Sequence, residues 1–304
     1  MAVTMPIVLP WPLQNSLEAA TQALLDPGDQ SSVDFLRPSG EAALISPDSV
    51  SWRVFKNPLS LFIGGVTAVL MELAEPRVRA GVWEHTTFRV DPIRRLRRTG
   101  LAAMVTVYGA RSTAETMIAR IRRMHDRIAG TTSAGKAYRA DDPDLLNWVQ
   151  ATAAFGFLQA YHSYVRPLPR VKRDHYYAEG IPAAALYGAT GAPKSEEALE
   201  AIFEQMAGRL ERSGVVFEFL AIMRSAPILP LPLRPVQHLL VRAALDQTPY
   251  WLRTILGLNG DGLRAWELAV VRGAGELADR LIVETNPAVQ ACRRMRLPVD
   301  YLYA

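Results

Sequence analysis

One histidine and a group of arginines carry the chemistry that this sequence suggests most directly. His125 follows Ile118 and Ile121 at helical spacing, so its imidazole falls on the apolar face of a predicted helix. Imidazole is a common metal ligand, and arginine binds carboxylates. A histidine on such a face, with arginines nearby, is what a haem with an iron centre and anionic propionates requires. The competing interpretation is a half-buried core histidine beside a solvated basic helix face.

The arginines belong to a second predicted helix, upstream of the histidine. Asp91 fits the capping position of this helix, and Pro92 fits its first turn. Arg95, Arg98 and Thr99 follow at i, i+3 and i+4, which places all three on one face. The sequence therefore predicts a helix with a basic face, followed by a helix that carries the histidine.

The ends of the histidine helix carry their own signals. Ser112 with Glu115 fits a capping box at the start, and Gly130 fits the left-handed position after the end. Residues 130–141 are rich in small and polar residues and are predicted to form a loop. Asp142-Pro143 repeats the start signal and opens a long helix.

The rest of the chain also indicates helices. We expect one helix from Pro58 through Ala74 that Pro76 stops, a mixed segment over 77–90, and a helix over Ser195–Arg212. Alternating strand patterns are few and no repeat is evident. These patterns predict an all-α fold with a single helical domain of globin-like character.

Composition limits the class of protein. The chain has 304 residues, 49% of them hydrophobic and 21% charged, which is typical of a globular protein. We expect an N-terminal extension over 1–50 and one functional domain over 51–304. The net charge of +4 combines 34 basic with 30 acidic residues, and no nucleic-acid-binding motif is present, so we expect no nucleic-acid partner.

The sequence also predicts a protein without disulfides or a membrane span. Cys292 is the single cysteine, so an intramolecular disulfide is impossible. The longest apolar run, Leu59–Ala74, contains Glu72 and falls short of the ~20 residues that a bilayer requires. The N-terminus lacks the basic and apolar regions of a secretory signal. We therefore expect a cytoplasmic protein.

Several catalytic motifs are absent. None of the five histidines has the neighbours of a facial triad or a di-iron bundle, and no His-Glu-x-x-His or Gly-x-Ser-x-Gly motif occurs. Glu72 and Glu75 could share a helix side, but that spacing is common on ordinary helices. An organic cofactor, a binding role without catalysis and a scaffold remain open.

A set of motifs, in order along the chain, resembles the MpaB-like and latex-clearing-protein family of haem-b oxygenases. The resemblance extends from about Trp52 to about Gly180, and its parts are Trp52-Arg53-Val54, Leu73-Ala74-Glu75-Pro76, Gly81-Val82, His85-Thr86, Asp91-Pro92, Arg95-x-x-Arg98-Thr99, Met124-His125-x-x-Ile128-x-Gly130, Asp142-Pro143 and Trp148-Val149-x-Ala151-Thr152.

The resemblance implies a helical fold that encloses haem b, with His125 as the proximal iron ligand. It places Arg95, Arg98 and Thr99 near the haem. Latex-clearing proteins have a lysine at the position of Arg98 that can occupy the distal iron site. The guanidinium of Arg98 stays protonated and is a poor ligand, so we expect a distal site open to water or dioxygen. Arg98 can then donate hydrogen bonds to dioxygen or to a substrate oxyanion.

Two positions depart from the family pattern. Glu75 and Gln150 stand where histidines are common. Glu75 is either a catalytic base in the pocket or a structural replacement. The resemblance implies a dioxygen-dependent reaction on a small apolar or unsaturated substrate, by cleavage of a carbon–carbon double bond or by oxygen insertion. The alternatives are another haem enzyme, such as a peroxidase, dehydrogenase or rearrangement catalyst, and a non-catalytic helical protein that binds haem or lipid.

Overall fold

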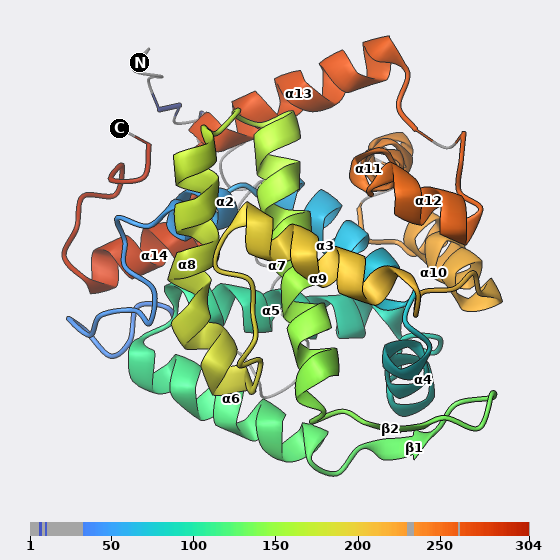
Figure 1. Ribbon diagram of the computed structural model, residues 1–304. Coiled ribbons are helices and arrows are strands. Elements are labelled where there is room, and N and C mark those ends of the chain that lie inside the picture. The colour runs from blue at the N-terminus through green and yellow to red at the C-terminus, as the bar shows by residue number, and fades with distance from the viewer. Residues whose placement is uncertain (1–5, 8–9, 11–32, 230–233, 261, 304) are drawn as a thin grey trace.

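The computed structural model describes residues 6–7, 10, 33–229, 234–260 and 262–303. This part of the chain forms thirteen helices, which pack against one another, and a single two-stranded sheet at one edge of the molecule (Figure 1). The predicted all-α fold is confirmed.

The helices, in chain order, are α2 (Val50–Phe55), α3 (Pro58–Glu72), α4 (Pro76–His85), α5 (Pro92–Tyr108), α6 (Arg111–His125), α7 (Pro143–Tyr164), α8 (Arg170–Tyr187), α9 (Glu196–Ala207), α10 (Gly214–Ser225), α11 (Arg234–Gln247), α12 (Tyr250–Leu256), α13 (Ala265–Arg280) and α14 (Pro287–Arg294). Strands β1 (Ala129–Thr131) and β2 (Ala137–Arg139) pair antiparallel, with Gly130 opposite Tyr138.

The centre of the fold is the contact between α3 and α7, the most extensive contact between two elements. Both helices are apolar on nearly all sides, as expected for buried helices. Two glycines permit the close approach, since a Cβ built on Gly64 would lie 2.7 Å from the carbonyl oxygen of Gly156. Trp52 and Trp148, both fully buried, pack into the surrounding core.

The predicted Asp-Pro start signals are confirmed. The Asp91 carboxylate accepts a hydrogen bond from the backbone N–H of Arg94 at the start of α5. Asp142 accepts from the backbone N–H of Asp144 at the start of α7. In both helices the proline fills an early position that needs no hydrogen-bond donor.

The predicted ends of the histidine helix are wrong. The helix begins at Arg111, and Ser112 donates from its backbone N–H and its hydroxyl to the Glu41 carboxylate, at 2.6 and 2.9 Å, in place of a capping box. The helix ends at His125, and Gly130 belongs to β1. The predicted loop over 130–141 therefore contains most of a hairpin. A Cβ on Gly130 would lie 2.6 Å from the Tyr138 hydroxyl oxygen, so glycine leaves room for the tyrosine side chain.

The segment after α3 also differs from expectation. Helix α3 ends at Glu72, and Pro76 opens α4 where a mixed segment was predicted. The reason is local, because the side chain of Glu75 caps the new helix. Helix α9 ends at Ala207, earlier than the predicted Arg212.

Part of the predicted extension packs against the helices. Phe35 is buried in the core, and the guanidinium of buried Arg294 donates to the carbonyl oxygens of Phe35, Glu41 and Tyr108. These bonds fasten residues 35–41 to α5 and α14.

Among the described helices, none is by itself long and apolar enough to cross a bilayer. Helices α3 and α4 pass that test only as a pair, and a bend of 112° separates them.

Candidate functional site

Arg95 and His125 meet because α5 and α6 form a helical hairpin. Both residues are equally far in sequence from Ala110, which lies in the turn between the helices. The two side chains are close enough for the Arg95 guanidinium to lower the pKa of His125. The hairpin thus places a cation and an imidazole together at its open end.

His125 presents a neutral imidazole in a sheltered position. It is the last residue of α6, and its Nδ1 atom is buried with no hydrogen-bond partner among the described residues. Burial lowers its pKa, and Arg95 lowers it further, while Asp126 and Asp141 act in the opposite direction. A neutral ring keeps one nitrogen lone pair available to a ligand.

Arg95 organises the basic face of α5. Its Nη1 atom donates to the Thr99 hydroxyl oxygen at 2.7 Å, and that hydroxyl donates to the Arg95 carbonyl oxygen at 2.9 Å. Burial lowers the pKa of Arg95, and nearby Arg98 also lowers it, whereas Glu72 raises it. Arg98 and Thr99 are exposed. The three residues share one face, as their spacing predicted.

Glu72 is the acidic neighbour of Arg95. It ends the apolar helix α3, and burial raises its pKa to about 7, although Arg95 acts to lower it. A carboxyl group with this pKa can accept or release a proton near neutral pH. Arg95 is therefore an electrostatic neighbour of both Glu72 and His125, and we call these three residues the Glu72 row.

Glu75, which stands where the family pattern commonly has histidine, caps a helix and pairs with an arginine. One of its oxygens accepts from the backbone N–H groups of Arg77 and Val78, at 2.6 and 2.9 Å. The other accepts from Nε of Arg77 at 2.8 Å. Arg77 also contacts Asp142, the cap of α7, at 3.4 Å. Glu75 thus joins the start of α4 to the start of α7.

Residues 52–280 match the family described as ER-bound oxygenase mpaB/B'/Rubber oxygenase, catalytic domain. The chain belongs to this family. No curated protein and no solved structure gives a significant match. The mpaB/rubber oxygenase match covers the whole Glu72 row and the basic face of α5, and it indicates a catalytic domain of the oxygenase type.

Several residues of the mpaB/rubber oxygenase motifs are part of the hydrophobic core of this chain. Trp52, Leu73, Ala74, Trp148 and Ala151 are fully buried. The side chains of Arg95, Arg98, Thr99 and His125 are instead partly or fully exposed. This division separates the motif residues that hold the helices together from those available for chemistry.

The hairpin that follows His125 takes part in a hydrogen-bonded group that the sequence did not predict. Tyr138 in β2 donates to Glu84 at 3.1 Å, and its hydroxyl lies 3.0 Å from Nε2 of His85. This contact anchors the hairpin that follows His125 to α4. The motif His85-Thr86 is visible in the sequence, but the partner is visible only once the hairpin register is known.

Proposed function

We propose that this mpaB/rubber oxygenase domain is a haem-b-dependent oxygenase in which His125 would hold the iron. The observation that supports it most directly is the buried, unpartnered Nδ1 atom of His125. Buried polar atoms without a partner are rare and call for an explanation, and for an imidazole nitrogen a bound metal ion is one such explanation. Burial and Arg95 both favour the neutral ring that ligation needs.

The donors around His125 suit a haem better than a bare metal ion. Within the described residues, no group of three or more histidine, cysteine, aspartate or glutamate side chains is placed to hold a metal. A single imidazole is sufficient where the other iron ligands come from the porphyrin. Arg95 and Arg98, two neighbouring cations, would bind the propionate carboxylates.

Bound haem and the side chains around it would have different roles. Bound haem would supply the redox chemistry with dioxygen, and the protein would supply position, charge and protons. Arg98 is exposed and always charged, so it would donate hydrogen bonds to dioxygen or to a substrate oxyanion. Thr99 fixes the Arg95 guanidinium through its 2.7 Å hydrogen bond.

Glu72 is the residue that we assign to proton transfer. Its pKa of about 7 lets the carboxylate accept a proton and then release it near neutral pH. Glu75 is not assigned to this step, because both its oxygens are engaged in capping α4 and pairing with Arg77.

We propose a small apolar or unsaturated organic substrate, with cleavage of a double bond or oxygen insertion as the outcome. The family to which the chain belongs, which includes rubber oxygenase, supports this class.

The deciding experiment is the absorption spectrum of the purified protein, oxidised and reduced, with pyridine extraction. We expect a Soret band and one haem b per chain. Dioxygen consumption and product mass, measured with unsaturated substrates, would then test the oxygenase assignment. Protein that stays colourless after reconstitution with haemin would contradict the proposal, and a haem protein that consumes no dioxygen would be a different haem enzyme.

A further inference from the structure

Helix α13 exposes an apolar face to solvent. It runs along one edge of the molecule, at the top of Figure 1, and packs on α3, α7 and α11. On its outer side, Trp266, Val270 and Leu277 are 61%, 51% and 52% exposed. Single exposed apolar residues are ordinary, but a row of them on one helix face indicates an interaction surface. This surface, which we call the α13 face, consists of the exposed residues Trp266, Ala269, Val270, Gly273, Ala274 and Leu277.

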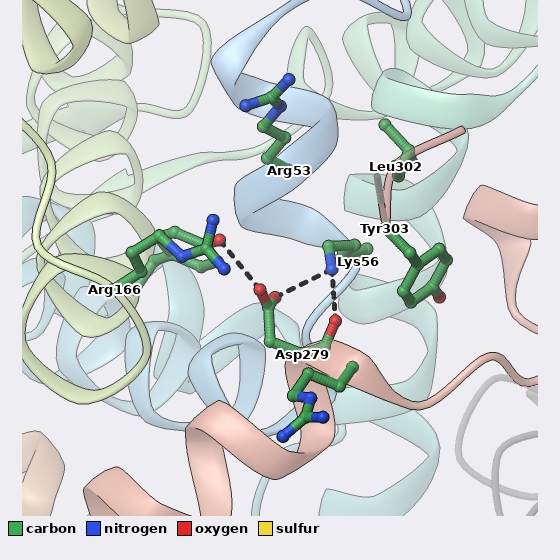
Figure 2. Close-up of a pocket in the computed structure, with 8 residues that line it drawn as sticks. Arg53, Lys56, Arg166, Asp279, Leu302 and Tyr303 are labelled. Atoms are coloured by element: carbon green, nitrogen blue, oxygen red, sulfur yellow. Dashed lines mark hydrogen bonds and ion pairs between the residues drawn. The ribbon is translucent and has the colours of Figure 1, made fainter. Parts of the chain in front are cut away.

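Polar contacts on the inner side of α13 fix the orientation of the helix. The buried carboxylate of Glu267 pairs with Arg242 of α11. One turn from the other end, the buried carboxylate of Asp279 lies 3.1 Å from Nζ of Lys56, and Figure 2 shows these two side chains meeting. A surface helix usually turns its apolar side to the core and its charged side to water. Helix α13 does the reverse, and rotation of its apolar face inward would break both ion pairs.

The order of residues along the α13 face is complementary to itself. Trp266, Val270, Gly273 and Leu277 follow at i, i+4, i+7 and i+11, the spacing by which two helices pack along a common seam. The face is also symmetric about its midpoint. When a second copy lies antiparallel with the midpoints opposite each other, Val270 faces the small Gly273 of that copy. Trp266 then faces Leu277, and the two alanines face each other, so large and small residues alternate across the contact.

The charges beside the α13 face favour a second copy of this chain over an anionic membrane. Between Trp266 and Leu277, the exposed charged residues are Arg272 and Glu276, which carry opposite charges. Two such faces therefore meet without net repulsion, although the whole chain has a net charge of +4. Helices that lie on a bilayer have instead a strongly basic polar side in contact with the headgroups, and the polar side of α13 is turned into the protein.

We propose that the α13 face is the contact of a two-fold symmetric homodimer, with α13 of one copy antiparallel to α13 of the other. A two-fold axis requires a surface that complements itself, and the α13 face has this property. One pair of helix faces buries less than the roughly 1,200–2,000 Å² of a standard interface. The dimer is therefore expected to be weak, with a dissociation constant in the micromolar range.

The test is sedimentation velocity of the full chain at concentrations from about 1 to about 300 μM, a range that brackets a micromolar dissociation constant. We expect the sedimentation coefficient to rise from that of one chain to that of two. The Val270→Glu variant places a carboxylate in the centre of the contact, so its dissociation constant should rise at least about tenfold. Val171→Glu is the matched control, because Val171 of α8 is 65% exposed and the same change there should leave the dimer intact.

A second variant, Gly273→Lys, tests the antiparallel register. A Cβ at Gly273 meets no atom within 4 Å, so this variant should fold. Each variant alone should stay largely monomeric. An equal mixture of Val270→Glu and Gly273→Lys should dimerise at least about tenfold more tightly than either alone, because the new carboxylate of one copy faces the new ammonium group of the other.

Three sedimentation results would overturn the proposal: wild type that stays monomeric over the whole range, equal weakening by Val171→Glu and Val270→Glu, or a mixture no tighter than its components. Vesicles of phosphatidylcholine and phosphatidylserine test the other occupant. If wild type is monomeric and binds these vesicles, and Val270→Glu does not, the α13 face contacts a membrane and the dimer is excluded.

Discussion

Arg95 and His125, in two antiparallel helices, are electrostatic neighbours: the guanidinium lowers the pKa of the imidazole. Burial of the ring acts in the same direction and is the larger cause. A proton on His125 would place a second positive charge beside Arg95 in a poorly solvated position. The pair therefore keeps the imidazole neutral at pH values where an exposed histidine would begin to charge.

The first prediction concerns the ligand. Replacing His125 by alanine removes the imidazole while leaving the basic face of α5, so haem content should fall from one per chain to near zero. His175→Ala is the matched control, because His175 is exposed on α8. Pyridine extraction measures the haem. Full occupancy and an unchanged spectrum in His125→Ala would remove His125 from the site.

The second prediction concerns Arg98. The Arg98→Ala variant should keep its haem and lose about 10²–10³-fold in kcat, because a charged donor to a developing oxyanion is removed. The Arg98→Lys variant should change the visible spectrum, since an amine that loses its proton can ligate iron whereas a guanidinium cannot. Wild-type kinetics in Arg98→Ala would exclude the residue from the mechanism.

The third prediction is a pH dependence that originates at Glu72. Its pKa in the folded protein, about 7, lies above the ordinary value of 4.5, so folding favours the protonated form. Stability from this residue is complete below pH 4.5 and is lost as pH rises towards 7. The Glu72→Gln variant should therefore gain stability over wild type at pH 8, by up to about 3 kcal/mol, and match it at pH 4.5. Urea unfolding at both pH values measures the difference.

The same substitution tests proton transfer. The Glu72→Gln variant should retain haem and lose the rise in activity that we expect near pH 7 in wild type. An identical pH–activity profile in both proteins would leave Glu72 with no part in the reaction.

The fourth prediction separates Glu75 from Glu72. The Glu75→Ala variant loses the cap of α4 and the closer of the two carboxylate partners of Arg77, so we expect about 3 kcal/mol less stability. Turnover per bound haem should stay near wild type. A variant with wild-type stability but a loss of kcat comparable to that of Glu72→Gln would instead establish Glu75 as a catalytic base.

The fifth prediction tests the packing of α3 on α7. An added methyl at Gly64 would lie 2.7 Å from the Gly156 carbonyl oxygen, so the Gly64→Ala variant must push the two helices apart. We expect a loss of about 3 kcal/mol in unfolding free energy. Gly180→Ala is the control, because a Cβ at Gly180 in α8 meets no atom within 4 Å and should be neutral or stabilising. Equal stability of the two variants would contradict the close contact.

The sequence alone determined the all-α class, the starts of α5 and α7, and the common face of Arg95, Arg98 and Thr99. These features depend on neighbours within a few residues. An aspartate before a proline caps a helix wherever the chain is placed, and i, i+3 and i+4 side chains share a face in any helix. The family motifs are likewise linear patterns.

The tertiary structure decided the features that depend on distant partners. Ser112 bonds Glu41, 71 residues away, so a local capping box gives way to a tertiary contact. Burial at the end of α3 raises the pKa of Glu72 to about 7, whereas the Glu75 carboxylate caps α4. Desolvation and charge proximity arise where packed segments meet, and for this reason spacing in the sequence could not predict the Glu72 row.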